Sequence, residues 1–354
     1  MKKIVFFTGS MGRGGAERVI SILSNLYAEK GWKVDIIMLL HNNSSGYLLD
    51  ERVNVKSFFP EKSNMVKKLF CNIKNVHSYI KREKPDVVVS FMAQNTAISG
   101  LACLGTGVRY IASERIDPAC VKRNFAYKKL IDILYAKADS VIFQTKRARD
   151  YFGAKIQKNG VIIGNPIKVA CNASDNPAKK IVAVGRLTYQ KNHKMLINAF
   201  KELSKLHREY ILEIYGEGEE RRNLSEQITL LGLEDKVFLR GNQLDIHEKI
   251  KDAQMFVLSS DFEGLSNALL EAMMMGIPCV STDCAGSDEV IVNRENGILV
   301  PVGDEKKLTD AIIELAEDDS LRKKIVANGK VSTEQFRVVN IIDKWVKVIE
   351  GDAL

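Results

Sequence analysis

The chain is poor in the features that mark membrane-spanning, disulfide-rich and metal-binding proteins. No apolar run approaches the roughly 18 residues that suggest a transmembrane helix. The start, residues 1–7, is expected to be too short for a signal peptide. The cysteines lack C-x-x-C spacing, which predicts small buried residues in a reducing cytosol and no zinc site or disulfide framework. The five histidines lack metal-ligand spacing, and we expect structural or surface roles for them; they are His41, His77, His193, His207 and His247.

Acidic residues are scarce in one half of the chain only. Residues 1–170 hold 28 Lys and Arg against 13 Asp and Glu, whereas the remainder holds 24 against 31, giving +8 for the whole chain. A basic half joined to an acidic half predicts that only the first meets a polyanion or an anionic membrane surface.

Short apolar runs alternate with helical stretches twice along the 354 residues. This alternation predicts an α/β fold with two parallel sheets and crossover helices. In the first half we expect strands at residues 3–8, 33–40, 86–91, 109–113 and 140–144, and a helix at 15–30. In the second we expect strands at 181–184, 211–215, 237–239, 255–258 and 278–282, and helices at 191–206 and 219–231. The domains are predicted at 1–168 and 178–337, with a polar linker at 173–179.

The segment DFEGLSNALLEAMMMGIP, residues 261–278, is the most informative one. It follows an apolar strand, and its helix is expected to run from about Leu265 to Met275, where Gly276 and Pro278 stop it. Glu271 falls among apolar helix residues, where a carboxylate is costly without a donor. Glu263 precedes a helix N-terminus, which favours an anion such as phosphate. The pair could hold both ends of a nucleotide diphosphate, or the segment could be a capped helix with one stray glutamate.

This Glu-x7-Glu segment resembles the signature of retaining glycosyltransferases of family 4, which have the GT-B fold of two Rossmann-like domains facing a cleft. The resemblance implies that Glu263 sits at the donor sugar and that Glu271 holds the ribose hydroxyls. It implies donor contacts for the intervening turn as well, at Gly264, Leu265, Ser266 and Asn267. In this family the last helix, here residues 338–354, crosses back to the first domain.

Two cations flank the turn GRLTYQKN, residues 185–192. Arg186 and Lys191 oppose the dipole of the following helix, so stability alone does not explain them, although a solvated basic loop remains an alternative. They suit a diphosphate, with Arg as a fork and Lys as a point charge. The segment resembles the family's G-R-L-x-x-x-K motif, in which both cations bind the donor diphosphate.

Other loops at strand ends are weaker candidates for donor binding. Gly14 and Gly15 follow the first strand in a G-G-A-E-R-V string frequent in family 4, although a plain tight turn would also explain them. By resemblance, the nucleotide base contacts Gly216, Asn242 and Gln243. Glu114 stands about where many family members carry a histidine that touches the donor sugar, so this chain is expected to read the sugar differently.

Two stretches, residues 62–84 and 121–138, read as basic amphipathic helices. The first carries Lys67 and Lys68 beside an apolar face, and the second carries Lys128 and Lys129. Such helices can lie on anionic membranes, or they can pack that face on the sheet and leave the lysines in solvent. The sequence leaves both interpretations open.

The resemblance therefore implies a retaining glycosyltransferase that moves a hexose or N-acetylhexosamine from a nucleotide diphosphate, UDP, to an acceptor hydroxyl. No D-x-D motif appears, so we expect no metal and no cofactor. Arg186, Lys191 and the helix N-terminus would stabilise the departing diphosphate, whose oxygen would serve as the base. We expect a lipid-linked acceptor in capsule, exopolysaccharide or O-antigen synthesis, and a cytoplasmic enzyme peripheral to the inner face of the membrane.

Two alternatives stay open at this point. A UDP-sugar 2-epimerase, also of the GT-B fold, would interconvert nucleotide sugars without an acceptor. A basic nucleic-acid-binding protein is a second alternative, although no aromatic-rich RNA motif or recognition helix is evident. An NAD dehydrogenase is disfavoured, because Glu17 replaces the third glycine of a G-x-G-x-x-G fingerprint counted from Gly12.

Overall fold

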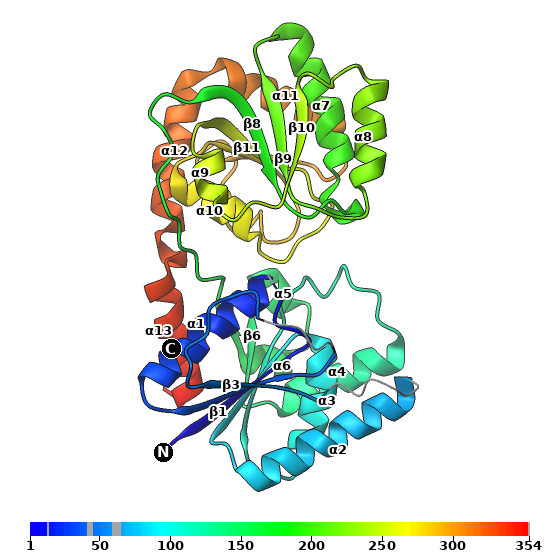
Figure 1. The fold of residues 1–354 in the computed structure, drawn as a ribbon, viewed down its shortest axis with the longest axis vertical. Coiled ribbons are helices and arrows are strands. Elements are labelled where there is room, and N and C mark those ends of the chain that lie inside the picture. The colour runs from blue at the N-terminus through cyan, green and yellow to red at the C-terminus, as the bar shows by residue number, and fades with distance from the viewer. Residues whose placement is uncertain (13, 41–44, 59–64, 353–354) are drawn as a thin grey trace. The chain divides into compact units, whose positions relative to one another are not determined.

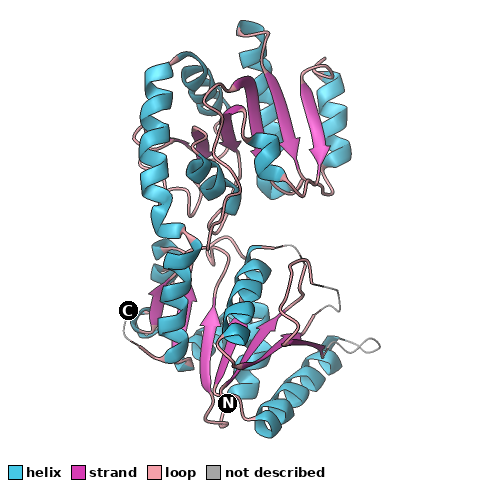
Figure 2. Cartoon of the chain, turned by 60° about the vertical axis from the view of Figure 1, so that its left-hand side comes forward, coloured by secondary structure: helices cyan, strands magenta, loops and turns pink. Residues whose placement is uncertain are grey.

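The computed structural model describes residues 1–12, 14–40, 45–58 and 65–352, with the side chains of residues 65–68 also outside the description. The predicted features at His41 and at the Lys67 and Lys68 side chains therefore lie outside the described residues. The chain divides into two compact units (Figures 1 and 2). Unit 1 comprises Met1–Pro166 and Ile341–Leu354, and unit 2 comprises Ile167–Asn340.

Unit 1 is built on a seven-stranded parallel sheet of order β3-β2-β1-β4-β5-β6-β7. Its strands are β1 (Lys3–Thr8), β2 (Lys33–Met38), β3 (Val53–Ser57), β4 (Val87–Phe91), β5 (Arg109–Ser113), β6 (Ser140–Phe143) and β7 (Gly160–Ile162). The central strands β1 and β4 are buried along their whole length. Burial on both faces is typical of parallel sheets and explains why these strands are almost continuously apolar.

Helices cover both faces of this sheet. They are α1 (Gly15–Glu29), α2 (Met65–Glu83), α3 (Ala93–Cys103), α4 (Phe125–Lys137), α5 (Lys146–Asp150), α6 (Ala154–Lys158) and α13 (Val338–Glu350). Val5 and Phe7 of β1 pack in one core with α2, α3 and α4. Phe91 of β4 stacks on Trp345 of α13, with ring centroids 5.4 Å apart. The last helix therefore joins the first unit from Ile341 onward.

Unit 2 repeats the plan with a six-stranded parallel sheet of order β10-β9-β8-β11-β12-β13. Its strands are β8 (Ala178–Val184), β9 (Ile211–Tyr215), β10 (Val237–Gly241), β11 (Ala253–Leu258), β12 (Cys279–Thr282) and β13 (Ile298–Val300). Its helices are α7 (His193–Leu206), α8 (Arg221–Leu230), α9 (Ile246–Ile250), α10 (Asn267–Met275), α11 (Glu305–Glu317) and α12 (Asp319–Thr333), with short 3-10 turns η1 (Tyr189–Lys191) and η2 (Glu334–Phe336). Helices α7 and α11 share one core, and α10 packs in the core on the opposite face of the sheet.

The α/β prediction with two parallel sheets is confirmed, and several bounds need correction. Strands β3, β7 and β13 were not predicted. Helix α10 begins at Asn267 and not at Leu265, and α7 begins at His193 because Tyr189–Lys191 forms a separate 3-10 turn. The residues predicted as a linker are fastened to unit 2, where the Ala173 N–H donates to the carbonyl of Met275 at 2.8 Å.

The two basic helices pack their apolar faces on the sheet over most of their length. Val76, Tyr79 and Ile80 of α2 are at most 2% exposed, and Ile131 and Tyr135 of α4 are fully buried. Each helix nevertheless leaves apolar side chains in solvent, namely Leu69, Phe70, Phe125 and Ile133. No helix in the described part of the chain is long and apolar enough to cross a bilayer.

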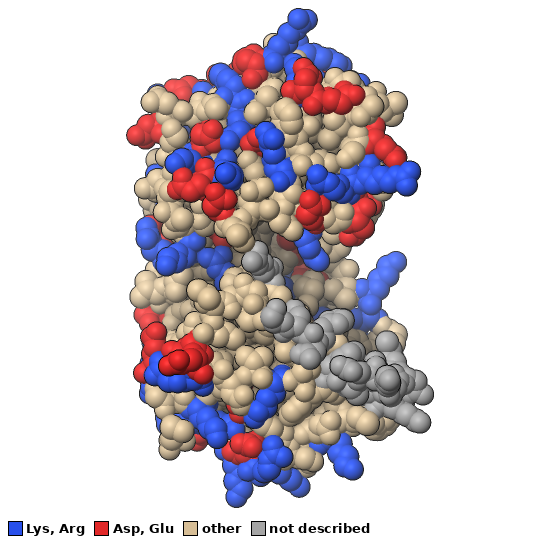
Figure 3. Space-filling model, viewed as in Figure 1, with Lys and Arg blue, Asp and Glu red and all other residues tan. Residues whose placement is uncertain are grey.

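The first half of the chain carries a net positive charge and the second half a net negative charge, as the residue counts show. On the face drawn in Figure 3, acidic side chains are interspersed with basic ones over unit 2. Many acids of unit 2 form short-range ion pairs with basic neighbours along the same helix, such as Arg222 with Glu226. Such exposed pairs contribute little to stability, roughly 0–1 kcal/mol each.

Candidate functional site

The candidate site of unit 2 is built where β11 gives way to α10. The strand is fully buried, and the loop of residues 259–266 carries the chain from its carboxyl end to the helix. Ser266 caps α10, and its hydroxyl accepts from the Leu269 N–H at 3.4 Å. Gly276, at φ +89°, ends the helix in the left-handed conformation that favours glycine. The sequence signals for the strand, the cap and the stop are therefore all realised.

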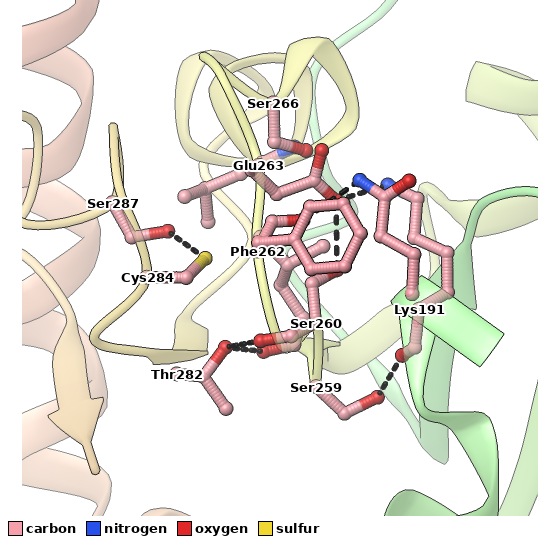
Figure 4. Close-up of polar contacts among 12 residues, drawn as sticks. Lys191, Ser259, Ser260, Phe262, Glu263, Ser266, Thr282, Cys284 and Ser287 are labelled. Atoms are coloured by element: carbon pink, nitrogen blue, oxygen red, sulfur yellow. Dashed lines mark hydrogen bonds and ion pairs between the residues drawn. The ribbon is translucent and has the colours of Figure 1, made fainter. Parts of the chain in front are cut away.

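Glu263 and Lys191 form the charged centre of this site (Figure 4). The Lys191 ammonium lies 2.5 Å from Glu263 Oε1, and their side chains are 14% and 11% exposed. The Ser260 hydroxyl donates to the same oxygen at 2.7 Å. The structure thus brings together the carboxylate predicted at the donor sugar and a cation predicted at the diphosphate.

The loop that carries Lys191 is fastened to the loop that carries Glu263 by further hydrogen bonds (Figure 4). The Gln190 amide donates to the Phe262 carbonyl at 2.7 Å, and the Ser259 hydroxyl donates to the Lys191 carbonyl at 2.9 Å. Asn192, which caps α7, donates to Asp261 at 2.8 Å. In addition, the Asp261 N–H donates to the Gln190 carbonyl at 2.9 Å. Two segments separated by about 70 residues in sequence are therefore held together by several hydrogen bonds.

Arg186 precedes Lys191 in the same loop but differs from it in exposure and pairing. Its side chain is exposed, and it makes no ion pair with any residue that the structure describes. An exposed cation beside a paired one leaves net positive charge at the start of α7. That charge is suited to receive an anion.

Close packing of backbone against backbone shapes the loops around the site. A Cβ on Gly216 would lie 1.9 Å from the Gly185 carbonyl oxygen, and Gly216 has φ +144°. A Cβ on Gly286, at φ +86°, would lie 1.8 Å from the oxygen of Gly264. Glycine is therefore required at both positions, because real Cβ atoms do not approach so closely. Gly216 is also predicted to contact the nucleotide base, and its packing against Gly185 does not depend on that contact.

Glu271 is the fifth residue of α10, and its side chain is 13% exposed. Its Oε2 atom lies 3.3 Å from Nε2 of His247 on α9. On the other side of that ring, Nδ1 accepts from the Ala170 N–H at 3.1 Å. An accepting Nδ1 places the proton of a neutral ring on Nε2, the atom that faces the carboxylate. His247, predicted to be structural or on the surface, thus neighbours a predicted ligand-binding residue.

The remaining predicted donor contacts of unit 2 lie in two places. Asn242 and Gln243 are exposed beyond the end of β10, and the Gln243 amide donates to the Arg240 carbonyl at 2.9 Å. Gly264, Leu265, Ser266 and Asn267 form the turn into α10 and its first residue. Leu265 and Ser266 are each 7% exposed.

Unit 1 holds the other three predicted donor contacts. Gly14 caps α1 and Gly15 is its first residue, while the Tyr47 hydroxyl donates to the Gly14 carbonyl at 3.1 Å. Glu114 is 2% exposed, and its Oε2 lies 2.7 Å from Arg123 and accepts from the Tyr135 hydroxyl at 3.1 Å. The carboxylate of Glu114 therefore already has internal partners.

Two further groups near the charged centre have perturbed pKa values. Burial, and then the charge of Lys191, lower the pKa of His193 from 6.5 to about 4, so its ring is neutral at pH 7. Burial raises the pKa of the Cys284 thiol, which lies 3.5 Å from the Ser287 hydroxyl (Figure 4). No group of three or more His, Cys, Asp or Glu in the described residues is arranged to hold a metal ion.

Some residues of the site had no signal in a single sequence. Ser259 and Gln190 act through contacts across about 70 residues, and Gly286 acts through backbone packing on another loop. A glycine after a β-strand is ordinarily read as a turn. Only the close contact between Gly286 and the backbone of Gly264 distinguishes Gly286 from a glycine in such a turn.

Known families match nearly the whole chain. The model described as glycosyl transferases group 1 matches residues 167–332, and the model described as glycosyltransferase family 4 matches residues 13–170. The chain belongs to the group 1 glycosyltransferases. It is a transferase enzyme with the GT-B fold.

Curated relatives of this glycosyltransferase span its full length. An N-acetylgalactosamine-N,N'-diacetylbacillosaminyl-diphospho-undecaprenol 4-alpha-N-acetylgalactosaminyltransferase of Campylobacter jejuni is 28% identical, over 99% of this chain and 100% of its own. The amylovoran biosynthesis glycosyltransferase AmsD of Erwinia amylovora is 26% identical, over 98% and 99%. The relatives thus include enzymes of exopolysaccharide and, in Rhizobium meliloti, of lipopolysaccharide core biosynthesis.

Solved structures share the fold at low sequence identity. HepE of Anabaena, in complex with UDP and glucose, superposes with a TM-score of 0.83 at 19% identity, covering 99% of this chain and 100% of HepE. The lipopolysaccharide outer core galactosyltransferase WaaB in its apo form gives 0.75 at 20% identity, covering 99% of both chains. At these identities the likeness establishes the fold.

Proposed function

We propose that this glycosyltransferase moves a hexose or N-acetylhexosamine from a UDP-sugar to a lipid-linked glycan, with retention of the α configuration. The observation that carries the proposal is the pairing of Lys191 with Glu263 at the entrance to α10, beside the exposed Arg186. HepE, a fold neighbour, binds UDP and UDP-glucose. The Campylobacter relatives act on undecaprenyl-diphosphate-linked acceptors.

In the proposed reaction the bond between the sugar C1 and the diphosphate oxygen breaks, and a bond from the acceptor oxygen to C1 forms. The acceptor proton passes to the departing phosphate oxygen. Arg186, Lys191 and the free N–H groups at the start of α10 stabilise the charge that develops on the diphosphate. Glu263 supports positive charge on the sugar, and Glu271 accepts hydrogen bonds from the ribose. Donor binding would then draw Lys191 partly away from Glu263.

The donor is tested by thermal stabilisation with a panel of UDP-, GDP-, ADP- and CMP-sugars, since a ligand that binds the folded state alone raises the melting temperature. We expect stabilisation by UDP and by one or a few UDP-sugars. NMR of the stabilising donor, with and without an acceptor extract, then identifies the reaction. Epimerisation of the donor without acceptor would contradict glycosyl transfer and indicate the 2-epimerase alternative.

The membrane part of the proposal rests on the basic first half and on the apolar residues that α2 and α4 leave in solvent. Phe70 is 69% exposed and Phe125 is 82% exposed, each within one turn of lysines. Association with the inner face of the membrane would then be peripheral and sensitive to salt, because the Debye screening length falls to about 3 Å at 1 M salt.

Flotation with vesicles tests this association. We expect the protein to float with vesicles containing anionic lipid at low salt, and not with neutral vesicles or at high salt. Replacing Lys67, Lys68, Lys128 and Lys129 by Gln should abolish flotation and leave UDP binding unchanged. Equal, negligible flotation under all conditions would contradict the membrane association and favour a soluble acceptor.

A further inference from the structure

Unit 1 contains a pocket of about 920 Å³ at the carboxyl ends of its central strands. Helices α2, α3 and α4 wall it, with α3 packed against both of the others. The ends of β2, β4 and β5 close it through Leu39, Met92 and Glu114. The volume lies within the range of about 300–1,000 Å³ that small-molecule sites occupy. The strand order reverses between β1 and β4, and ligands of open α/β sheets bind outside the strand ends at such a point.

The walls of this pocket are mostly aliphatic. Leu40, Leu69, Ala97, Ile98, Leu101 and Leu130 contribute to them. Leu69 is 41% exposed, and the apolar lining therefore continues to the protein surface. An aliphatic pocket that opens to the surface is suited to a hydrocarbon chain entering from outside.

The charge on the pocket is positive. Arg123 and Glu114 neutralise each other at 2.7 Å, with side chains 8% and 2% exposed. Lys122 is exposed and forms no ion pair with the described residues. The uncompensated charge is therefore a single cation on an apolar pocket, which suits an apolar chain with an anionic head.

Two buried polar atoms of the lining have no hydrogen-bond partner among the described residues. They are the Tyr127 hydroxyl and Oδ1 of Asn72, whose residue is 3% exposed. Buried polar atoms are ordinarily paired, so these two are suited to bind polar atoms of a ligand.

The backbone at the pocket is also strained. Met92, between β4 and α3, has φ +72° and ψ 143°, a conformation that a residue with a side chain rarely adopts. Such strain costs roughly 1–3 kcal/mol and clusters at ligand-binding sites. It fixes the Met92 side chain where the strand ends and the pocket begins.

We propose that this pocket binds the isoprenoid segment next to the diphosphate of a polyprenyl-diphosphate-linked acceptor, with Lys122 at the diphosphate. The proposal rests on the proposed function and names where the lipid part of that acceptor lies. Among the described residues the pocket offers one cation without an ion pair, Lys122, which fits a single branched chain with one anionic head, whereas a phospholipid brings two acyl chains.

Calorimetry on the full chain tests the proposal, with saturating UDP present so that the donor site is filled. The probes are farnesyl diphosphate, inorganic diphosphate and dihexanoylphosphatidylglycerol. We expect farnesyl diphosphate to bind at least about tenfold more tightly than either of the others, since each buried methylene contributes about 0.8 kcal/mol. Equal affinity for farnesyl and inorganic diphosphate would overturn the proposal, and so would tighter binding of the phospholipid.

Variants locate the binding. Leu69→Asn with Leu101→Asn should weaken farnesyl diphosphate binding about tenfold or more, whereas Phe70→Asn, the adjacent exposed residue on α2, should leave it unchanged. Lys122→Gln, which cannot disturb the core, should weaken it severalfold. Unchanged affinity in both pocket variants would overturn the proposal. Titration of UDP alone reports separately on the proposed function, because the residues proposed to bind the diphosphate and ribose, Arg186, Lys191 and Glu271, lie in unit 2 and these substitutions lie in unit 1.

Discussion

Unit 1 and unit 2 have the same arrangement of parallel strands but carry different groups at the carboxyl ends of those strands. In unit 2 the loops are tied together by hydrogen bonds and by glycine packing around the Lys191–Glu263 pair. In unit 1 the strand ends open into an apolar pocket whose cation Lys122 forms no ion pair with the described residues. The comparison teaches that this fold leaves the chemistry of a domain to its loops, as expected where function resides in sites grafted on a common scaffold.

The largest expected effect comes from removing the Lys191 ammonium, the cation paired with Glu263 in unit 2. Lys191→Ala should lower turnover about 10²–10³-fold, the loss typical for one preorganised donor to a developing anion, and should leave the fold intact. Steady-state kinetics with circular dichroism measures both. Lys194→Ala, which changes an exposed lysine in the first turn of the following helix α7, is the matched control and should behave as wild type. Near-normal turnover in Lys191→Ala would remove the diphosphate role and, with it, the chemical contrast between the units.

The buried neutral His193 should make the stability of unit 2 depend on pH in mild acid. Its pKa falls from 6.5 to about 4 on folding, so the unfolded state binds more protons between these values and stability is lost as pH falls through that window. This group should cost up to about 3 kcal/mol between pH 7 and pH 4. Urea unfolding at both pH values checks it. His193→Gln should lose less stability over this range than wild type, and an equal loss in both would refute the assignment.

The two glutamates of unit 2 should separate binding from chemistry. Glu271→Ala should weaken UDP binding about tenfold, the effect of one charged hydrogen bond, and should slow the saturated reaction less. Glu263→Gln should do the reverse, sparing UDP affinity and lowering turnover. Calorimetry with UDP and saturation kinetics distinguish the two patterns. Unchanged UDP affinity in Glu271→Ala would return that residue to a purely structural role.

The smallest expected effect concerns the neighbour of Glu271. His247→Ala should weaken UDP binding only about threefold, because the ring orients the carboxylate and does not replace it. His247→Gln, which keeps an N–H group beside Glu271, should recover part of the affinity. His207→Ala, at an exposed ion pair with Glu317, serves as the control. Equal UDP affinity in His247→Ala and wild type would show that Glu271 needs no such support.

The sequence predicted the elements that carry strong local signals. Strand β9 was predicted at its observed bounds, and α10 ends at Met275 as Gly276 and Pro278 require. Strand β3, at the edge of its sheet, has partly exposed residues, and β7 and β13 are only three residues long. An edge strand and three-residue strands are held by their neighbours, and no apolar periodicity within them predicts their pairing.

The site was predicted only as separate parts. Two separate motifs indicated them, one for Arg186 and Lys191 and the other for Glu263 and Glu271. The direct contact between Lys191 and Glu263 depends on how β8 and β11 pair in the sheet, which brings their following loops together. The contact of His247 with Glu271 depends likewise on α9 and α10 packing on one face. Such contacts are properties of the folded sheet, and no spacing in the sequence encodes them.

The hydrogen bonds between the Gln190–Asn192 and Ser259–Glu263 loops also restrict how such enzymes can be recombined. A chimera with a crossover between these loops would join halves from two parents and require residues of different origin to reproduce five interlocking bonds. Crossovers at the unit boundaries, Pro166/Ile167 and Asn340/Ile341, keep both loops from one parent. The two loops that carry Lys191 and Glu263 should therefore be inherited together, as one block within unit 2.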